Sequence, residues 1–212
     1  MLLNYWGEFL GLAVIHFLAV IAPGPDFAVT IRQSVRFGRW AGICTAIGIG
    51  AGISIHVIYT LVGISALMHA TPWLMVIAKL IGAIYIMWLG IKFIRSKPAN
   101  LDTLAEEEII LTSQSKWKAF WMGFMTNALN PKATLFFLAV FTTVVSSNTP
   151  TLIQAFYGAW MCIVNAVWFV FVSIIFSNEL IRNKFMQKGY LFERVMGIVL
   201  IGFAVRLLFL SI

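Results

Sequence analysis

Six apolar stretches of this chain are each long enough to cross the hydrocarbon core of a membrane, and this restricts the fold more than any other feature. A spanning helix needs about 20 apolar residues, and a chain that is 61% hydrophobic and only 11% charged is too apolar for a soluble domain. The stretches are apolar around their whole circumference, as membrane helices are. They cover residues 9–31, 41–67, 73–93, 120–145, 152–176 and 191–210. We expect an all-α integral membrane protein with six transmembrane helices.

Positive charge is confined to alternate connections between these stretches. Apart from Lys79, Lys132 and Arg206, the lysines and arginines form three groups. Three arginines follow the first stretch, five basic residues run from Lys92 at the end of the third stretch to Lys118 before the fourth, and four run from Arg182 after the fifth stretch to Arg194 at the start of the sixth. Positive residues collect on the cytoplasmic side, so we expect six crossings with both termini in the periplasm. The net charge of +7 then reflects orientation, and no nucleic-acid partner is expected. A re-entrant first stretch would instead give five crossings and a cytoplasmic N-terminus.

The first apolar stretch is interrupted by the sequence APGPDF. Proline lacks an amide hydrogen and clashes with the preceding helical turn, so Pro23, Gly24 and Pro25 are expected to open the helix within the membrane, directly before Asp26. Backbone groups released at such a break need partners in a polar cavity. The sequence therefore predicts a polar site at Pro23–Asp26.

The fourth stretch carries a similar interruption, NALNPK, with a base in place of the acid. Asn127, Asn130 and Pro131 surround Lys132 there. Three stretches precede the long connection and three follow it, so the second half begins on the opposite side of the membrane. The pattern predicts a 3+3 inverted repeat in which the first helix of each half is broken, a plan typical of secondary transporters.

This repeat divides a single transporter domain, residues 1–212, into two halves joined by a linker. The first repeat covers residues 1–95, the cytoplasmic linker 96–116, and the second repeat 117–212. Three consecutive glutamates at 106–108 indicate that the linker is solvated.

The acid of one break and the base of the other suit a zwitterionic amino acid, which carries one ammonium and one carboxylate. Charges inside a membrane are costly and are functional by default. We therefore expect Asp26 and Lys132, together with the broken helix ends, to line the path of an amino acid. The alternative is a structural ion pair between Asp26 and Lys132.

Other polar residues within the apolar stretches are candidates for coupling or packing. His56 and Asp26 are candidate proton-coupling residues, because both can titrate. His16 is a weaker candidate for a proton role, and Asn165 is expected to hydrogen-bond between helices.

Small residues recur at four-residue spacing in the second stretch, at Gly38, Gly42, Ala46, Gly50 and Ser54. Such a stripe permits close helix packing inside the chain, a homodimer face, or a sliding surface.

Motifs of several enzyme classes do not occur in the sequence. It contains no GxxxxGK[ST], HExxH or GxSxG pattern, and Cys44 and Cys162 lie in apolar stretches without a ligand set for a metal. We expect no enzyme activity, no cofactor and no bound metal. A membrane enzyme or assembly scaffold is the least supported alternative.

The sequences APGPDF, GAIYIMWLGIK and NALNPKATLFF resemble those of the LysE-type amino-acid exporter family, and its threonine and homoserine exporter branch in particular. The resemblance implies a bacterial inner-membrane exporter driven by the proton gradient. It assigns the two substrate motifs to Pro23, Gly24, Pro25 and Asp26, and to Asn130, Pro131 and Lys132. Lysine and arginine exporters of this family tend to carry GPQN where this chain has GPDF, which favours neutral substrates.

The expected function is secondary-active export of small neutral amino acids, threonine- or homoserine-like, by proton antiport. The expected partners are the amino acid, protons and the lipid bilayer. The alternative is a channel, or an exporter of another small polar solute such as a basic amino acid, homoserine lactone or a metal cation.

Overall fold

The protein is helical throughout its described part. A computed structural model describes residues 5–22, 24–70, 72–97, 114–146 and 148–210. Within these ranges there are α-helices and no strand, so the predicted all-α class is confirmed. The helices are α1 (Trp6–Ile21), α2 (Pro25–Phe37), α3 (Arg39–Ala70), α4 (Pro72–Ile94), α6 (Lys116–Ala128), α7 (Pro131–Thr143), α8 (Thr151–Phe176) and α9 (Glu179–Leu210).

The helices coincide with the six apolar stretches, two of which are divided into a pair. α1 with α2 covers the first stretch and α6 with α7 the fourth, while α3, α4, α8 and α9 cover the others. Among the described residues, Arg39–Gly63 and Thr151–Phe176 are long and apolar enough to span a membrane, and α1 with α2 is a third candidate if the bent pair counts as one span. The number of crossings therefore stays a prediction.

Both divided helices are interrupted where the sequence places proline. α2 begins at Pro25 and α7 begins at Pro131. Proline is accepted at the first position of a helix because that amide has no intrahelical partner. α1 and α2 are bent by 51° relative to each other. The predicted breaks are thus present in both halves.

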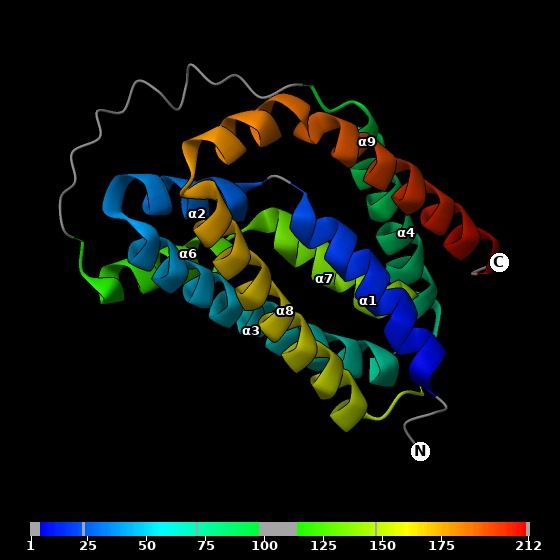
Figure 1. The fold of residues 1–212 in the computed structure, drawn as a ribbon. Coiled ribbons are helices and arrows are strands. Elements are labelled where there is room, and N and C mark those ends of the chain that lie inside the picture. Colours follow the sequence, from blue (N-terminus) through cyan, green and yellow to red (C-terminus); the bar gives the residue numbers. More distant parts are fainter. Residues whose placement is uncertain (1–4, 23, 71, 98–113, 147, 211–212) are drawn as a thin grey trace.

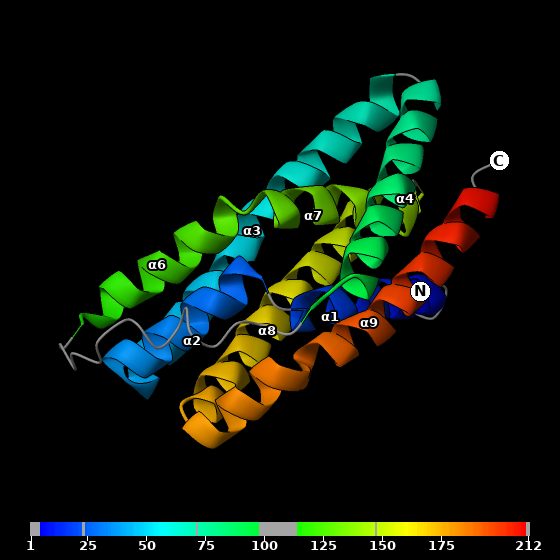
Figure 2. The same cartoon turned by 90° about the horizontal axis from the view of Figure 1, so that it is seen from above.

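α3 is the central helix of the bundle. It packs against both α6 and α8, whereas α4 packs against α9 and α7. Figures 1 and 2 show α3 running beside α8, with α4 beside α9. Rings from several helices meet in the core, where Phe137 and Tyr157 are almost fully buried. The two interrupted pairs, α1 with α2 and α6 with α7, both contact this packed interior.

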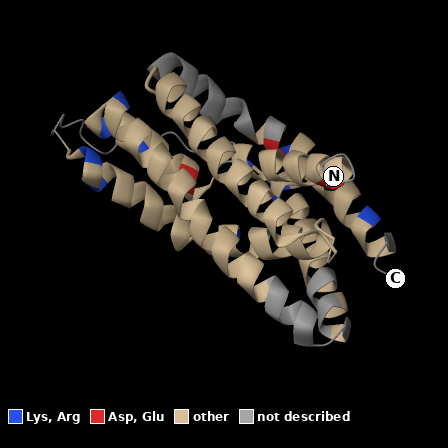
Figure 3. Ribbon diagram, turned by 90° about the horizontal axis from the view of Figure 1, so that it is seen from below, with Lys and Arg blue, Asp and Glu red and all other residues tan. Residues whose placement is uncertain are grey.

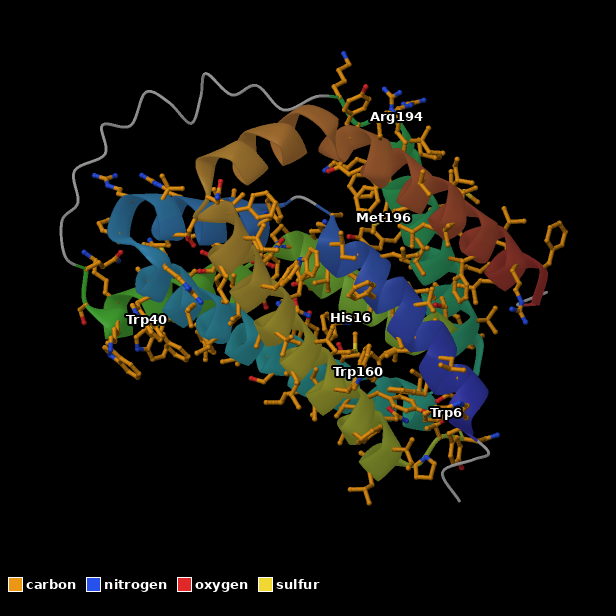
Figure 4. The ribbon with its side chains drawn as sticks, in the orientation of Figure 1. Trp6, His16, Trp40, Trp160, Arg194 and Met196 are labelled. Atoms are coloured by element: carbon orange, nitrogen blue, oxygen red, sulfur yellow. The ribbon has the colours of Figure 1, made fainter. Side chains whose placement is uncertain are left out.

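The surface of the bundle is mostly uncharged. Figure 3 shows lysine and arginine at few places along the ribbon. Trp6 and Trp40, at the starts of α1 and α3, are 56% and 68% exposed and lie toward opposite ends of the molecule (Figure 4). Tryptophan is typical of the boundary between lipid and water, so both positions suit a bundle embedded in a bilayer.

Glycines bring α3 into backbone contact with its neighbours. A Cβ atom added to Gly48 of α3 would overlap the carbonyl group of Phe120 in α6, and one added to Gly123 of α6 would overlap that of Thr45. A Cβ atom added to Gly50 would lie 2.6 Å from the Cβ atom of Ala166 in α8. Gly42 and Gly50 of the small-residue stripe therefore pack inside the chain, against Ser34, Ser173 and Ala166.

Polar contacts also join distant parts of the chain away from this crossing. Glu8 in the first turn of α1 accepts hydrogen bonds from the Ser146 amide and the Thr149 hydroxyl, both at 2.9 Å. Arg194 of α9 donates to the carbonyl oxygen of Ser96 at 3.1 Å. Residues 98–113, which include most of the predicted linker and its three glutamates, lie outside the described residues.

Replacing Gly123 with alanine is expected to lower the melting temperature, because the added methyl overlaps the backbone of Thr45 and overpacking costs about 1–3 kcal/mol. Thermal unfolding of the detergent-purified protein, followed by size-exclusion chromatography, measures the effect. Gly63→Ala is the matched control on α3, since a Cβ there meets no atom within 4 Å. The control is expected to melt at or above the wild-type temperature. Equal melting of Gly123→Ala and wild type would contradict the close contact.

Candidate functional site

Both helix breaks line one pocket inside the bundle. Its cavity volume is about 50 Å³, enough for a few water molecules. The residues of the first break that line it are Gly24, Pro25 and Asp26, and those of the second are Asn127, Asn130 and Lys132. The two segments singled out by their prolines are therefore walls of the same cavity.

Asp26 lies in the first turn of α2 and has one carboxylate oxygen engaged. Its Oδ2 accepts a hydrogen bond from the side-chain amide of Asn127 at 2.9 Å. Its Oδ1 is buried and has no hydrogen-bond partner. This oxygen makes no hydrogen bond to Lys132, although the opposite charges of Asp26 and Lys132 attract each other, and the ion pair stays an open alternative. Asp26 keeps an acceptor for a cationic group.

Lys132 is positioned by its own backbone and by an aromatic ring. Its amide donates to the Asn130 side chain at 3.0 Å, which caps α7, and its carbonyl accepts from the Tyr85 hydroxyl at 3.0 Å. The ammonium nitrogen lies 5.2 Å from the centroid of the Phe93 ring, at the distance of a cation–π contact. These contacts fix the start of α7 against α4 and hold a positive charge beside the pocket.

His56 is buried on α3 and contacts the second break. Its Nε2 lies 2.9 Å from the carbonyl oxygen of Asn127, and its Nδ1 lies 2.8 Å from the Tyr59 hydroxyl. The side chain of the same Asn127 is bonded to Asp26. The two residues predicted to couple protons are thus connected through one asparagine.

Six of the eight predicted substrate-binding residues line the pocket. The other two are Pro131, which is not among the lining residues, and Pro23. Pro131 is exposed and is the first residue of α7, so its structural role is to begin that helix. Pro23 lies outside the described residues. His56 contacts Asn127 and is not among the lining residues. The roles of all these residues stay predictions.

The pocket also has walls that the motifs do not indicate. His16 and Asn165 line it and are bonded to each other at 2.8 Å, so the expected interhelical bond of Asn165 is present. Ile53, Phe136 and Phe169 add apolar surface. In the sequence, His16 and Asn165 stand out only as polar residues within apolar stretches. That pattern does not indicate that the two side chains contact each other. Among the described residues no group of three or more His, Cys, Asp or Glu gathers as a metal site.

The LysE type translocator family matches residues 17–211 of the chain. The chain belongs to this family. The threonine efflux protein of Salmonella typhi is 26% identical over 94% of this chain and 97% of its own length, and that of Escherichia coli K12 is 25% identical with the same coverage. The uncharacterized membrane protein YrhP of Bacillus subtilis is 28% identical over 89% of this chain and 92% of its own. No solved structure matches the chain.

Membership of the LysE type translocators confirms the family resemblance carried by the two proline motifs. The family consists of transporters rather than enzymes, and relatives such as YrhP are described as membrane proteins. A membrane transporter that acts on amino acids fits the family and the apolar helices. The pocket at the two breaks is accordingly the candidate site of its solute.

A cysteine at Ala133, which lines the pocket on α7, is expected to react with a small water-soluble methanethiosulfonate reagent in membranes. A cysteine at Ala139, two turns further along α7 and 1% exposed, is expected to stay unmodified because it lies in the apolar core. Both are introduced after Cys44 and Cys162 have been replaced by alanine. Mass spectrometry measures the rate at which each cysteine is labelled. Equal rates at the two positions would contradict a water-accessible pocket at the breaks.

Proposed function

We propose that the protein exports small neutral amino acids, threonine- or homoserine-like, from the cytoplasm in exchange for protons. The observation that carries this proposal is the pocket in which the acid of one helix break and the base of the other form walls. The threonine efflux proteins among its relatives support the substrate class.

The substrate ammonium is assigned to Asp26 and Asn127. Oδ1 of Asp26 and Oδ1 of Asn127 are both buried acceptors without a hydrogen-bond partner, and both residues line the pocket. The last carbonyl groups of α1 also lack intrahelical partners and carry partial negative charge. An ammonium group would supply the donor that each of these acceptors lacks.

The substrate carboxylate is assigned to Lys132 and to the helix N-termini at the breaks. α2 begins at Pro25 and α7 at Pro131, and the positive end of a helix dipole attracts anions. In α7 the Lys132 amide already donates to the Asn130 side chain, so the helix contributes through its dipole rather than through that amide. The Lys132 ammonium adds a full positive charge next to them. Each break therefore contributes a charge and a helix end of use to a zwitterion.

The remaining walls favour a small neutral side chain. Ile53, Phe136 and Phe169 are apolar, and Asp26 is the one acid among the lining residues that the structure describes. A basic side chain would need a second acid there, since an unpaired charge inside the bundle is costly. The present cavity of about 50 Å³ is too small for an amino acid, so binding requires its walls to move apart.

The proposed architecture is six crossings in a 3+3 inverted repeat, with residues 1–95 and 117–212 as the halves and residues 96–116 as a cytoplasmic linker. Both halves begin with a helix broken at proline. Equivalent helices also pack together, α3 on α8 and α4 on α9. The alternation of basic connections supports periplasmic termini in a bacterial inner membrane. A homodimer remains compatible with this plan.

Proton coupling is assigned to Asp26 and His56. Asn127 contacts both, through its side chain and its carbonyl oxygen respectively. A proton on Asp26 would remove the charge that holds the ammonium, so proton and substrate would compete for this carboxylate. Such competition is what exchange of a proton for an amino acid requires.

Asp26→Asn and Lys132→Ala are each expected to reduce threonine efflux at least tenfold, because each removes the partner of one charged group of the substrate. Efflux of labelled threonine from preloaded cells measures this at matched expression. The controls are Lys118→Ala, an exposed lysine at the start of α6, and Asp102→Asn in the predicted linker. Wild-type rates in both site variants would refute the assignment.

Threonine accumulation in inside-out vesicles with a preformed proton gradient is expected to stop when a protonophore is added. The proposal requires this because uphill transport is driven by proton movement in the opposite direction. Flux that continues down the threonine gradient at an unchanged rate would indicate a channel instead.

A further inference from the structure

A buried histidine and asparagine form part of the pocket wall away from both breaks. His16 of α1 is 1% exposed and Asn165 of α8 is 3% exposed. Figure 4 shows His16 where α1 passes α8, close to Trp160. Both residues line the cavity that Asp26 and Lys132 also line. The pair is therefore placed to contact whatever part of a substrate the charged residues do not hold.

The hydrogen bonds of Asn165 determine which nitrogen of His16 carries the proton. The Asn165 side-chain nitrogen donates to the Met161 carbonyl oxygen at 3.1 Å, which identifies it as the amide nitrogen. The same nitrogen lies 2.8 Å from His16 Nε2 and donates to it. In the neutral ring Nε2 is then the acceptor and Nδ1 carries the hydrogen. Nδ1 is buried and has no hydrogen-bond partner.

We propose that His16 is a specificity-determining residue whose Nδ1–H donates a hydrogen bond to the side-chain hydroxyl of the transported amino acid. This rests on the proposed function, in which Asp26 and Lys132 hold the ammonium and carboxylate that all amino acids share. The side chain then faces the other walls. Ile53, Phe136 and Phe169 offer no polar group there, whereas His16 offers a donor whose orientation Asn165 fixes.

The physical basis of the selectivity is the cost of a buried donor without an acceptor. A hydroxyl supplies the acceptor, and an aliphatic side chain of the same shape does not. Sites built to bind a substrate hydroxyl therefore discriminate strongly against the analogue that lacks it. Threonine and valine differ in this way while having nearly the same shape, and so do homoserine and norvaline.

The experiment compares uptake of labelled threonine and valine into inside-out vesicles that contain the full-length protein. Wild type is expected to transport threonine at least tenfold faster than valine. In His16→Leu this ratio is expected to fall below threefold, with valine transport unchanged or increased. His16→Gln, which keeps an N–H donor, is expected to retain an intermediate ratio. Asn165→Leu, which releases the ring from its fixed tautomer, is also expected to lower the ratio.

Tyr157→Phe is the matched control. It removes another hydrogen bond of α8 with the N-terminal segment, that of the Tyr157 hydroxyl to the Tyr5 carbonyl oxygen at 3.2 Å, at a residue that does not line the pocket. Its threonine-to-valine ratio is expected to equal that of wild type. Repeating the comparison with homoserine and norvaline tests the same donor on a longer side chain.

Three results would overturn the inference. An unchanged ratio in His16→Leu, or a parallel loss of both substrates at matched expression and melting temperature, would show that His16 supports the structure only. Wild-type vesicles that transport threonine and valine equally would show that no hydroxyl is recognised, although export itself would stand. Wild-type vesicles that transport neither amino acid would overturn the proposed function together with the inference.

Discussion

The structure depends on the need of polar groups inside an apolar bundle to find partners. Prolines divide two helices, and each break releases backbone groups and places a charge beside them. Local hydrogen bonds satisfy part of the backbone, such as that of the Asn130 amide to the Asn127 carbonyl oxygen, but the charged side chains need partners from elsewhere. The two breaks instead line a common cavity, where Asp26 of the first half is bonded to Asn127 of the second. The central helix α3 packs against α6, and this packing brings the second break to the first.

The division of polar groups in the pocket follows from this arrangement. Acceptors without partners belong to Asp26 and Asn127, and the positive charge belongs to Lys132. The imidazole of His16, whose Nδ1 has no hydrogen-bond partner, lies on another wall among the aromatic rings of Phe136, Phe137 and Trp160. The cavity thus combines fixed polar groups of different kinds with apolar surface, which is the usual composition of a small-molecule site.

Local features of the sequence predicted the helices and the position of the breaks. Proline acts on its own helix, so Pro25 and Pro131 could be placed from sequence, as could the apolar stretches that became α3 and α8. The partners within the site could not. Whether Asp26 contacts Lys132 or Asn127 depends on how α2, α6 and α7 cross, and that is decided by backbone contacts at glycines such as Gly48 and Gly123. His16 and Asn165 are 149 positions apart, and nothing in either stretch indicates the other.

The bond between Asp26 and Asn127 has a consequence for the order in which the chain is made. The two residues are 101 positions apart. Asp26 is therefore synthesised, and reaches the membrane, well before Asn127 has been made. The separation along the chain is larger for His16 and Asn165, which are 149 positions apart. Contacts between such distant residues form late in folding. The first half must therefore tolerate an unsatisfied acid during biosynthesis, and the pocket exists only once most of the second half has been made.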